Sequence, residues 1–128
     1  NPYQIWGDGN QERDFTYVED IVEGTILAGE KIFDGTPVNL GTGDRYKMID
    51  VVNMIFKILN WKPDTIEFDT SKPVGALSRA LNNERANNLL GWSPRFDLES
   101  GLRKTIDWYK GSHKLEGSVD EDILLERK

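Results

Sequence analysis

The sequence contains no cysteine and only one histidine, His113. Without cysteine the chain has no disulfides, thiolate metal ligands or cysteine nucleophiles. A single histidine gives no basis for a histidine-rich metal site or for a catalytic pair of serine and histidine. We interpret His113, which follows the last predicted helix among polar residues, as a solvated side chain. We therefore assign no catalytic residue and no metal ligand in this chain.

Long apolar runs and an excess of basic residues are also missing. No stretch approaches the roughly 18 apolar residues of a membrane-spanning helix, and no signal peptide is visible. The 22 acidic residues outnumber the 16 Lys and Arg, which gives a net charge of −6. General binding to nucleic acids or acidic membranes needs a basic surface, so this charge argues against both. We expect a cytoplasmic protein with no nucleic-acid or membrane partner.

The chain also begins at Asn1, without a methionine. Its 128 residues are enough for one domain with a buried core. We expect a piece of a larger protein rather than a complete gene product, with its folded domain at residues 1–113. Residues 114–128 are mostly charged apart from Ile123–Leu125, and are expected to form a frayed charged tail or a short docking helix.

Short apolar segments alternate with helical periodicity along the chain. The turn-forming residues Gly7–Asn10 predict a hairpin between Gln4–Trp6 and a second strand at Glu12–Val18. Further strands are expected at Pro37–Leu40 and Thr65–Asp69, with irregular or extended structure from Thr70 to Leu81. Helices are predicted from Glu19 to about Asp34, from Met48 to the break at Pro63, from the Asn82–Asn83 cap through Leu90, and from about Asp97 to Lys110.

Each strand-to-helix step is too short for a large open sheet. The expected fold class is therefore α/β, as a small cluster of short strands, partly paired in parallel, packed against three or four helices. The glycines of Gly41–Gly43 follow a predicted strand, as in a dinucleotide-binding turn, but Tyr46 stands where a third glycine is needed. We expect these glycines to serve a tight turn rather than to bind a cofactor.

Three basic residues lie where an acidic protein has little structural need for them. Arg13 falls in a predicted strand next to aromatic residues, and Lys72 and Arg79 share one extended stretch. Guanidinium groups bind phosphate with two hydrogen bonds, and a lysine beside them adds a compact charge. The pattern is compatible with a pyrophosphate site, and equally with surface salt bridges to the abundant acids.

Four motifs in order resemble one known family over about residues 2–109. They read WGDGNQERDFTYVED at residues 6–20, NLGTG at 39–43, KPVG at 72–75 and LLGWSP at 89–94. The chain is similar in these motifs to the extended short-chain dehydrogenases of the NAD-dependent epimerase/dehydratase family, which act on nucleotide sugars. The stretch from Asp69 to Gly75 looks most like GDP-fucose synthase, although Val74 stands where those proteins usually carry an acid.

The resemblance implies roles for five residues in binding substrate. Arg13 matches the arginine that contacts the nucleotide diphosphate, and Lys72 matches a position where many relatives place an arginine on the same group. Arg79 is a further candidate for this contact. Trp6 and Gly7 lie where the family's substrate strand lines the nucleotide pocket.

The resemblance also implies what this chain lacks. The family uses an N-terminal Rossmann domain for NAD or NADP and a Tyr-x-x-x-Lys pair for catalysis, and neither motif occurs here. The chain thus resembles the C-terminal substrate-binding part of an NAD(P)-dependent nucleotide-sugar enzyme. We expect it to bind an NDP-hexose such as a GDP-sugar, to bind no cofactor and to be inactive alone. Two alternatives remain open: a free-standing module that binds nucleotide sugars or a partner protein, and a fragment that forms a homodimer through its apolar helices.

Overall fold

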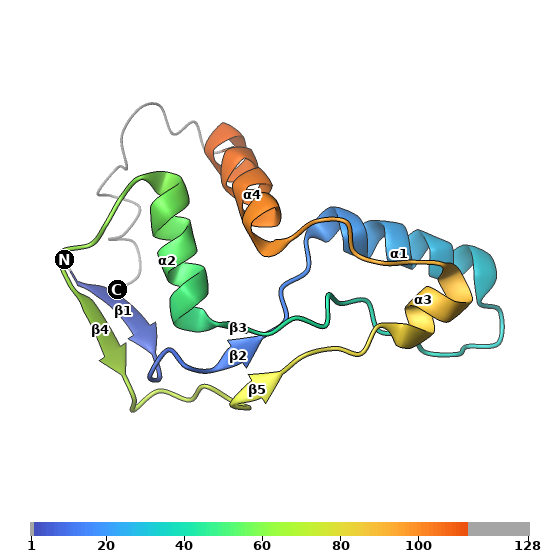
Figure 1. Ribbon diagram of the computed structural model, residues 1–128, viewed down its shortest axis with the longest axis horizontal. Coiled ribbons are helices and arrows are strands. Elements are labelled where there is room, and N and C mark those ends of the chain that lie inside the picture. The colour runs from blue at the N-terminus through green and yellow to red at the C-terminus, as the bar shows by residue number, and fades with distance from the viewer. Residues whose placement is uncertain (1, 113–128) are drawn as a thin grey trace.

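Two apolar cores, one near each end of an elongated molecule, organise the computed structural model (Figure 1). The structure describes residues 2–112. The predictions for His113 and for the 114–128 tail therefore lie outside the described residues. Within residues 2–112 the chain forms four helices and five short strands, in the α/β arrangement that the sequence predicts.

The first core lies between a parallel strand pair and one helix. Strand β1 (Tyr3–Trp6) pairs in parallel with β4 (Ile66–Asp69), and α2 (Met48–Leu59) packs on this pair. Helix α2 supplies Ile49, Val52 and Phe56 to this contact. The buried residues of this core are Ile5, Val52 and Phe56. The rings of Tyr3 and Trp61 pack edge-on against Phe56, with distances of 5.0 and 5.2 Å between ring centroids.

The second core lies between α1 (Val18–Lys31) and α3 (Glu84–Leu90). Its fully buried residues are Ala86, Leu90 and Trp92. Helix α3 ends at Gly91, whose φ of +70° gives the left-handed C-terminal conformation that the sequence predicts. Helix α4 (Leu98–Ser112) then lies between the two ends of the molecule in Figure 1.

A three-stranded sheet connects the two cores. Strand β2 (Glu12–Arg13) lies in its centre, antiparallel to β3 (Tyr46–Lys47) and parallel to β5 (Ser78–Arg79). Strand β5 falls inside the stretch predicted to be irregular or extended. Each strand has two residues, so the sheet stabilises the fold mainly by joining three distant segments at one place.

The predicted hairpin is wrong. Gly7 and Gly9 do form a turn, with φ of +82° and +77°, but β1 pairs with β4 instead of β2. The second strand also ends at Arg13 instead of Val18. The carboxylate of Asp14 explains this early end, because it binds backbone N–H groups of two other segments in place of continuing the ladder.

The strand predicted at Pro37–Leu40 is also absent. No other strand lies beside this segment within residues 2–112, and Val38 and Leu40 pack against the second core. Helix α1 begins at Val18 and ends at Lys31, a few residues earlier than predicted, and the C-terminal ends of α2 and α4 differ from the expected bounds by a few residues.

Candidate functional site

The structure brings the end of β1 next to the segment that follows β4. Trp6, the last residue of β1, is in register with Asp69. Lys72 follows three residues later, and its ammonium group lies 5.8 Å from the centroid of the Trp6 ring, within the range of a cation–π contact. The Trp6 side chain is 54% exposed, so much of it remains open to a ligand.

Gly7 allows the turn at residues 73–76 to pack against the end of β1. Its φ of +82° is a conformation that side chains rarely adopt, and a Cβ here would overlap the Val74 side chain. The nearest polar neighbour is Gln11, whose Oε1 would lie 3.3 Å from that Cβ. Gly7 is therefore required both by its backbone angle and by this close approach.

Arg13 is half-buried and holds the same turn from the other side. Its Nη1 donates to the carbonyl oxygens of Glu12 and Ala76, both at 2.7 Å, and its Nη2 donates to the carbonyl oxygen of Val74 at 2.5 Å. Gly75 lies between the two acceptors with a φ of +70°. The guanidinium thus binds backbone groups 61 and 63 residues away in sequence.

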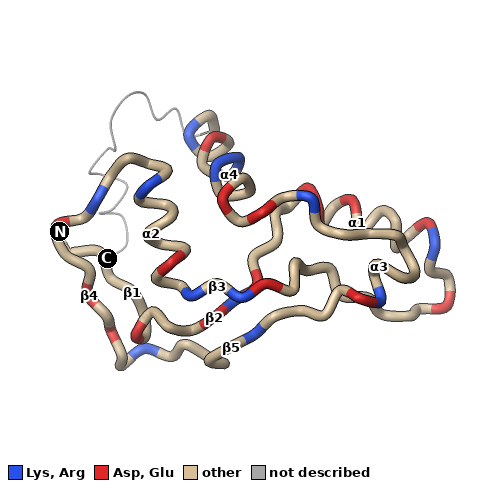
Figure 2. The backbone as a smooth tube through the Cα atoms, viewed as in Figure 1, with Lys and Arg blue, Asp and Glu red and all other residues tan. Residues whose placement is uncertain are grey.

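Arg79 completes a group of basic residues around this turn. It is exposed and stands in register with Arg13 on the parallel strands β2 and β5. Within residues 2–112, none of Arg13, Lys72 and Arg79 forms an ion pair with an acidic side chain. The salt-bridge alternative therefore finds no support in the described part of the chain. Figure 2 shows basic positions on all three strands of the central sheet.

Gln11 is a residue that sequence reasoning missed. It is only 7% exposed, and its Nε2 donates to the carbonyl oxygen of Trp6 at 2.8 Å. Its Oε1 is buried without a hydrogen-bond partner in the structure. Its position two residues before Arg13 gave no signal in sequence, because its hydrogen bond is to a backbone carbonyl, which every residue type has. Gln11 fixes the backbone at the end of β1 and thus the position of Trp6.

Asp14 anchors the strand that carries Arg13. Its carboxylate accepts hydrogen bonds from the N–H and hydroxyl of Thr42 and from the N–H groups of Gly43 and Leu81. Burial acts to raise the pKa of Asp14, but these hydrogen bonds outweigh it, and the net pKa lies below the ordinary 3.8. A Cβ on Gly41 would lie 2.8 Å from this carboxylate. This close approach supports the structural interpretation of the Gly41–Gly43 turn.

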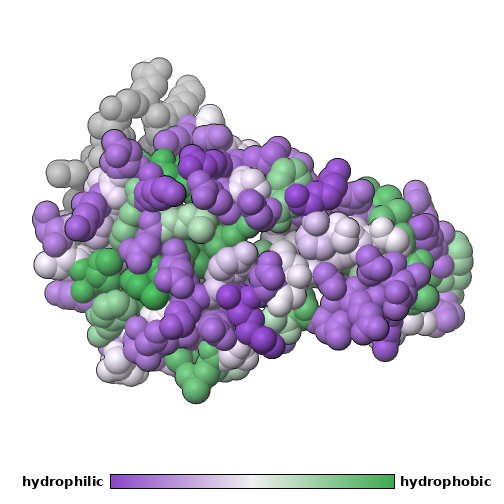
Figure 3. Space-filling view, viewed as in Figure 1, coloured by the Kyte–Doolittle hydropathy of each residue, from purple (hydrophilic) through white to green (hydrophobic). Residues whose placement is uncertain are grey.

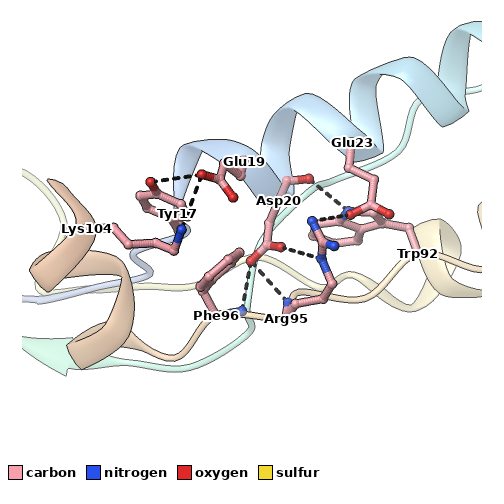
Figure 4. A network of polar contacts seen from close by, with 8 residues as sticks. All are labelled: Tyr17, Glu19, Asp20, Glu23, Trp92, Arg95, Phe96 and Lys104. Atoms are coloured by element: carbon pink, nitrogen blue, oxygen red, sulfur yellow. Dashed lines mark hydrogen bonds and ion pairs between the residues drawn. The ribbon is translucent and has the colours of Figure 1, made fainter. Parts of the chain in front are cut away.

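Asp20 joins the second core to the loop before α4 (Figure 4). It is fully buried, and its Oδ2 accepts hydrogen bonds from the N–H groups of Arg95 and Phe96, both at 3.1 Å. Its backbone oxygen accepts the indole N–H of Trp92 at 2.9 Å. Asp20 thus has a structural role, while the neighbouring Glu19 accepts from Tyr17 and pairs with Lys104.

The sequence model described as GDP-mannose 4,6 dehydratase matches residues 1–105. This chain belongs to the GDP-mannose 4,6-dehydratase family. The match includes Trp6, Gly7, Arg13, Lys72 and Arg79, so all five residues of the candidate site lie in the part of the chain that carries the family's sequence pattern.

Similar proteins are named for GDP-, UDP- and dTDP-sugars, and two GDP-sugar enzymes are among them. The chain is 37% identical over 108 residues to GDP-L-colitose synthase of Yersinia pseudotuberculosis, covering 83% of this chain and 34% of that protein. It is 33% identical over 103 residues to GDP-L-fucose synthase of Sinorhizobium fredii, covering 80% and 32%. The predicted similarity to GDP-fucose synthase is confirmed. The chain spans about a third of the length of these curated relatives.

The family fold is confirmed by solved structures. UDP-glucuronic acid 4-epimerase from Bacillus cereus, in complex with UDP-glucuronic acid and NAD, matches with a TM-score of 0.77 and 33% identity, covering 88% of this chain and 36% of that one. Within residues 2–112, no three His, Asp or Glu side chains are grouped so as to hold a metal ion, and no helix is both long and apolar enough to cross a membrane. A cytoplasmic location stays a prediction.

Proposed function

We propose that this chain is the nucleotide-sugar-binding part of an NAD(P)-dependent epimerase, dehydratase or reductase, and that its substrate is a GDP-hexose. The observation that carries the proposal is the gathering of Arg13, Lys72 and Arg79 around one turn of a chain with a net charge of −6. Two segments distant in sequence supply this local positive site, and none of the three basic side chains forms an ion pair among residues 2–112.

The register of Arg13 and Arg79 favours an anionic ligand. Like charges directly opposite on neighbouring strands destabilise a sheet unless an anion lies between them. A diphosphate supplies two negative groups, and a guanidinium binds phosphate with two parallel hydrogen bonds. The exposed ring of Trp6, with Lys72 beside it, offers an apolar face for the base or the sugar.

The choice of GDP-sugar is supported by the relatives named GDP-L-colitose synthase and GDP-L-fucose synthase. The Bacillus cereus relative is solved with NAD and a UDP-sugar. Since this chain has neither a dinucleotide fingerprint nor a Tyr-x-x-x-Lys pair, we infer that another part of the parent protein binds NAD or NADP. On this proposal the chain alone is inactive and gives no saturable signal in a titration with NADH.

We also infer that an apolar surface on α1 faces the cofactor-binding part of the parent protein. Val18, Val22 and Ile26 follow at four-residue spacing and are 60%, 51% and 56% exposed. Val18 also lines a groove of about 570 Å³ whose other apolar side chains include Phe15, Leu102 and Trp108. Figure 3 shows apolar side chains among polar ones in the region that α1 occupies in Figure 1. Sedimentation of wild type and Val22→Glu distinguishes this surface from a homodimer interface. If the surface forms a homodimer, wild type sediments as a dimer and Val22→Glu as a monomer.

Calorimetric titration with a GDP-sugar tests the proposed function. Arg13→Ala should weaken binding by about 10- to 100-fold, because a hydrogen bond to a charged group contributes about 1.5–3 kcal/mol. The matched control is Arg103→Ala, which removes an arginine paired with Glu99 on α4 and should leave the affinity unchanged. Equal affinities for wild type and Arg13→Ala would contradict the proposal.

A further inference from the structure

The guanidinium of Arg13 is only partly used inside the chain. An arginine side chain has five N–H donors, and three of those of Arg13 bind the carbonyl oxygens of Glu12, Val74 and Ala76. The Nε–H and one N–H of Nη2 have no partner within residues 2–112. Two free donors of one guanidinium can bind two oxygens of a single anion.

The acceptors of Arg13 belong to the turn that links the other two basic residues of the site. Val74 and Ala76 lie between Lys72 and Arg79, and their carbonyl oxygens converge on the guanidinium from either side of Gly75. The next carbonyl, that of Leu77, accepts the N–H of Glu12 at 2.8 Å and begins the pairing of β5. The conformation of the turn therefore fixes where Lys72 and Arg79 stand.

We propose that Arg13 is a positioning residue as well as a ligand for phosphate. Its bonds to Val74 and Ala76 order the turn before any ligand arrives, and this order fixes the backbone that joins Lys72 to Arg79. The ordering role does not depend on the ligand. Only the second role, the binding of a phosphate by the Nε–H and Nη2 donors, rests on the proposed function.

A lysine cannot replace Arg13 in both roles. Its single ammonium group has no planar fork, and it cannot reach two diverging carbonyl oxygens and a phosphate at once. Arg13→Lys keeps the positive charge but loses the arrangement of donors. The variant therefore separates the charge of the site from the order of the turn.

The order of the turn is measured by ¹⁵N relaxation of the ligand-free chain. The order parameters of the Gly75, Ala76 and Leu77 amides should be about 0.85 in wild type and fall below about 0.6 in Arg13→Lys. Lys72→Gln is the matched control, because it removes a positive charge directly before the same turn. The Lys72 side chain makes no hydrogen bond to these carbonyls, so the order parameters should stay at the wild-type values. Amides of α2 serve as the reference for an intact fold.

Unchanged order parameters in Arg13→Lys overturn the positioning role. If that variant does not fold, the arginine side-chain signals of wild type provide the test: on addition of GDP the Nε–H signal of Arg13 should shift and the Nη1 signals should stay. A shift of all of them together would mean that the bonds to the turn break on binding, which also overturns the inference. An ordered turn in a wild-type chain that binds no GDP would refute the proposed function and leave the positioning role standing.

Discussion

Asp14 and Thr42 are joined by two hydrogen bonds, one from the backbone N–H at 3.1 Å and one from the hydroxyl at 2.6 Å. Asp14 also binds Gly43 and Leu81 and follows directly after Arg13. These bonds fix the backbone that carries the proposed phosphate ligand, although Asp14 itself makes no contact with the basic side chains of the site.

Asp14→Asn should therefore lower the free energy of unfolding. The amide replaces one carboxylate oxygen by an NH₂ group, which then faces N–H donors and leaves them unpaired. We expect a loss of about 1–3 kcal/mol, measured by urea denaturation at neutral pH. Asp14→Asn with wild-type stability would show that these hydrogen bonds contribute nothing.

The same substitution should change the acid sensitivity of the chain. The folded pKa of Asp14 lies below 3.8, so its contribution to stability is complete above pH 3.8 and is lost as the pH falls through the lower folded value. The difference in unfolding free energy between wild type and Asp14→Asn should shrink over this acid range. A difference that stays constant down to the lowest pH at which wild type folds would contradict the lowered pKa.

Asp20→Ala should destabilise the second core. The substitution leaves the N–H groups of Arg95 and Phe96 without their acceptor in a partly buried place, at a cost of about 1–3 kcal/mol. Chemical denaturation followed by tryptophan fluorescence measures the loss, because Trp92 is bonded to the same residue. Glu23→Gln, which removes only the partly exposed pair with Arg95, is the control and should cost less than about 1 kcal/mol.

Two glycine substitutions should act in opposite directions. In Gly41→Ala the new Cβ would lie 2.7 Å from Leu81 Cβ, so we expect a loss of about 1–3 kcal/mol. In Gly29→Ala, on α1, nothing lies within 4 Å of the new Cβ, and alanine should raise stability by about 0.5–1 kcal/mol. Thermal unfolding of the pair reports the signs. A stabilising Gly41→Ala would show that the close approach to Leu81 relaxes at no cost.

The helices of this fold could be predicted from sequence because their signals are local. Apolar spacing placed α1 to α4 within a few residues, and Gly91 ended α3 as expected. The positions of β1 and β4 were predicted to within one residue in the same way, but the pairing of the strands was not, since β1 pairs with residues 66–69 and β2 with residues 46–47 and 78–79. The pairing partners of a strand of two to four residues are distant in sequence, so the local pattern of residues does not identify them.

The candidate site was predictable in part for the same reason. Arg13 and Lys72 stood out as basic residues in an acidic chain, Trp6 came from a family motif, and the structure places all three around one turn. The bonds from Arg13 to the carbonyl groups of Val74 and Ala76 involve only backbone acceptors, which every residue type has. The side chain of Gln11 likewise binds a backbone acceptor, the carbonyl oxygen of Trp6. Neither feature is visible in the order of the amino acids.

The most direct test of the proposed site is to locate bound GDP by ¹H–¹⁵N correlation spectra of the chain. The largest shifts should occur at the Trp6 indole, the Arg13 side chain and the amides of residues 72–79, and they should saturate. Guanosine, which lacks the diphosphate, should leave the Arg13 signal in place. Shifts centred on another part of the chain, or none at millimolar GDP, would contradict the claim that this turn is a diphosphate site.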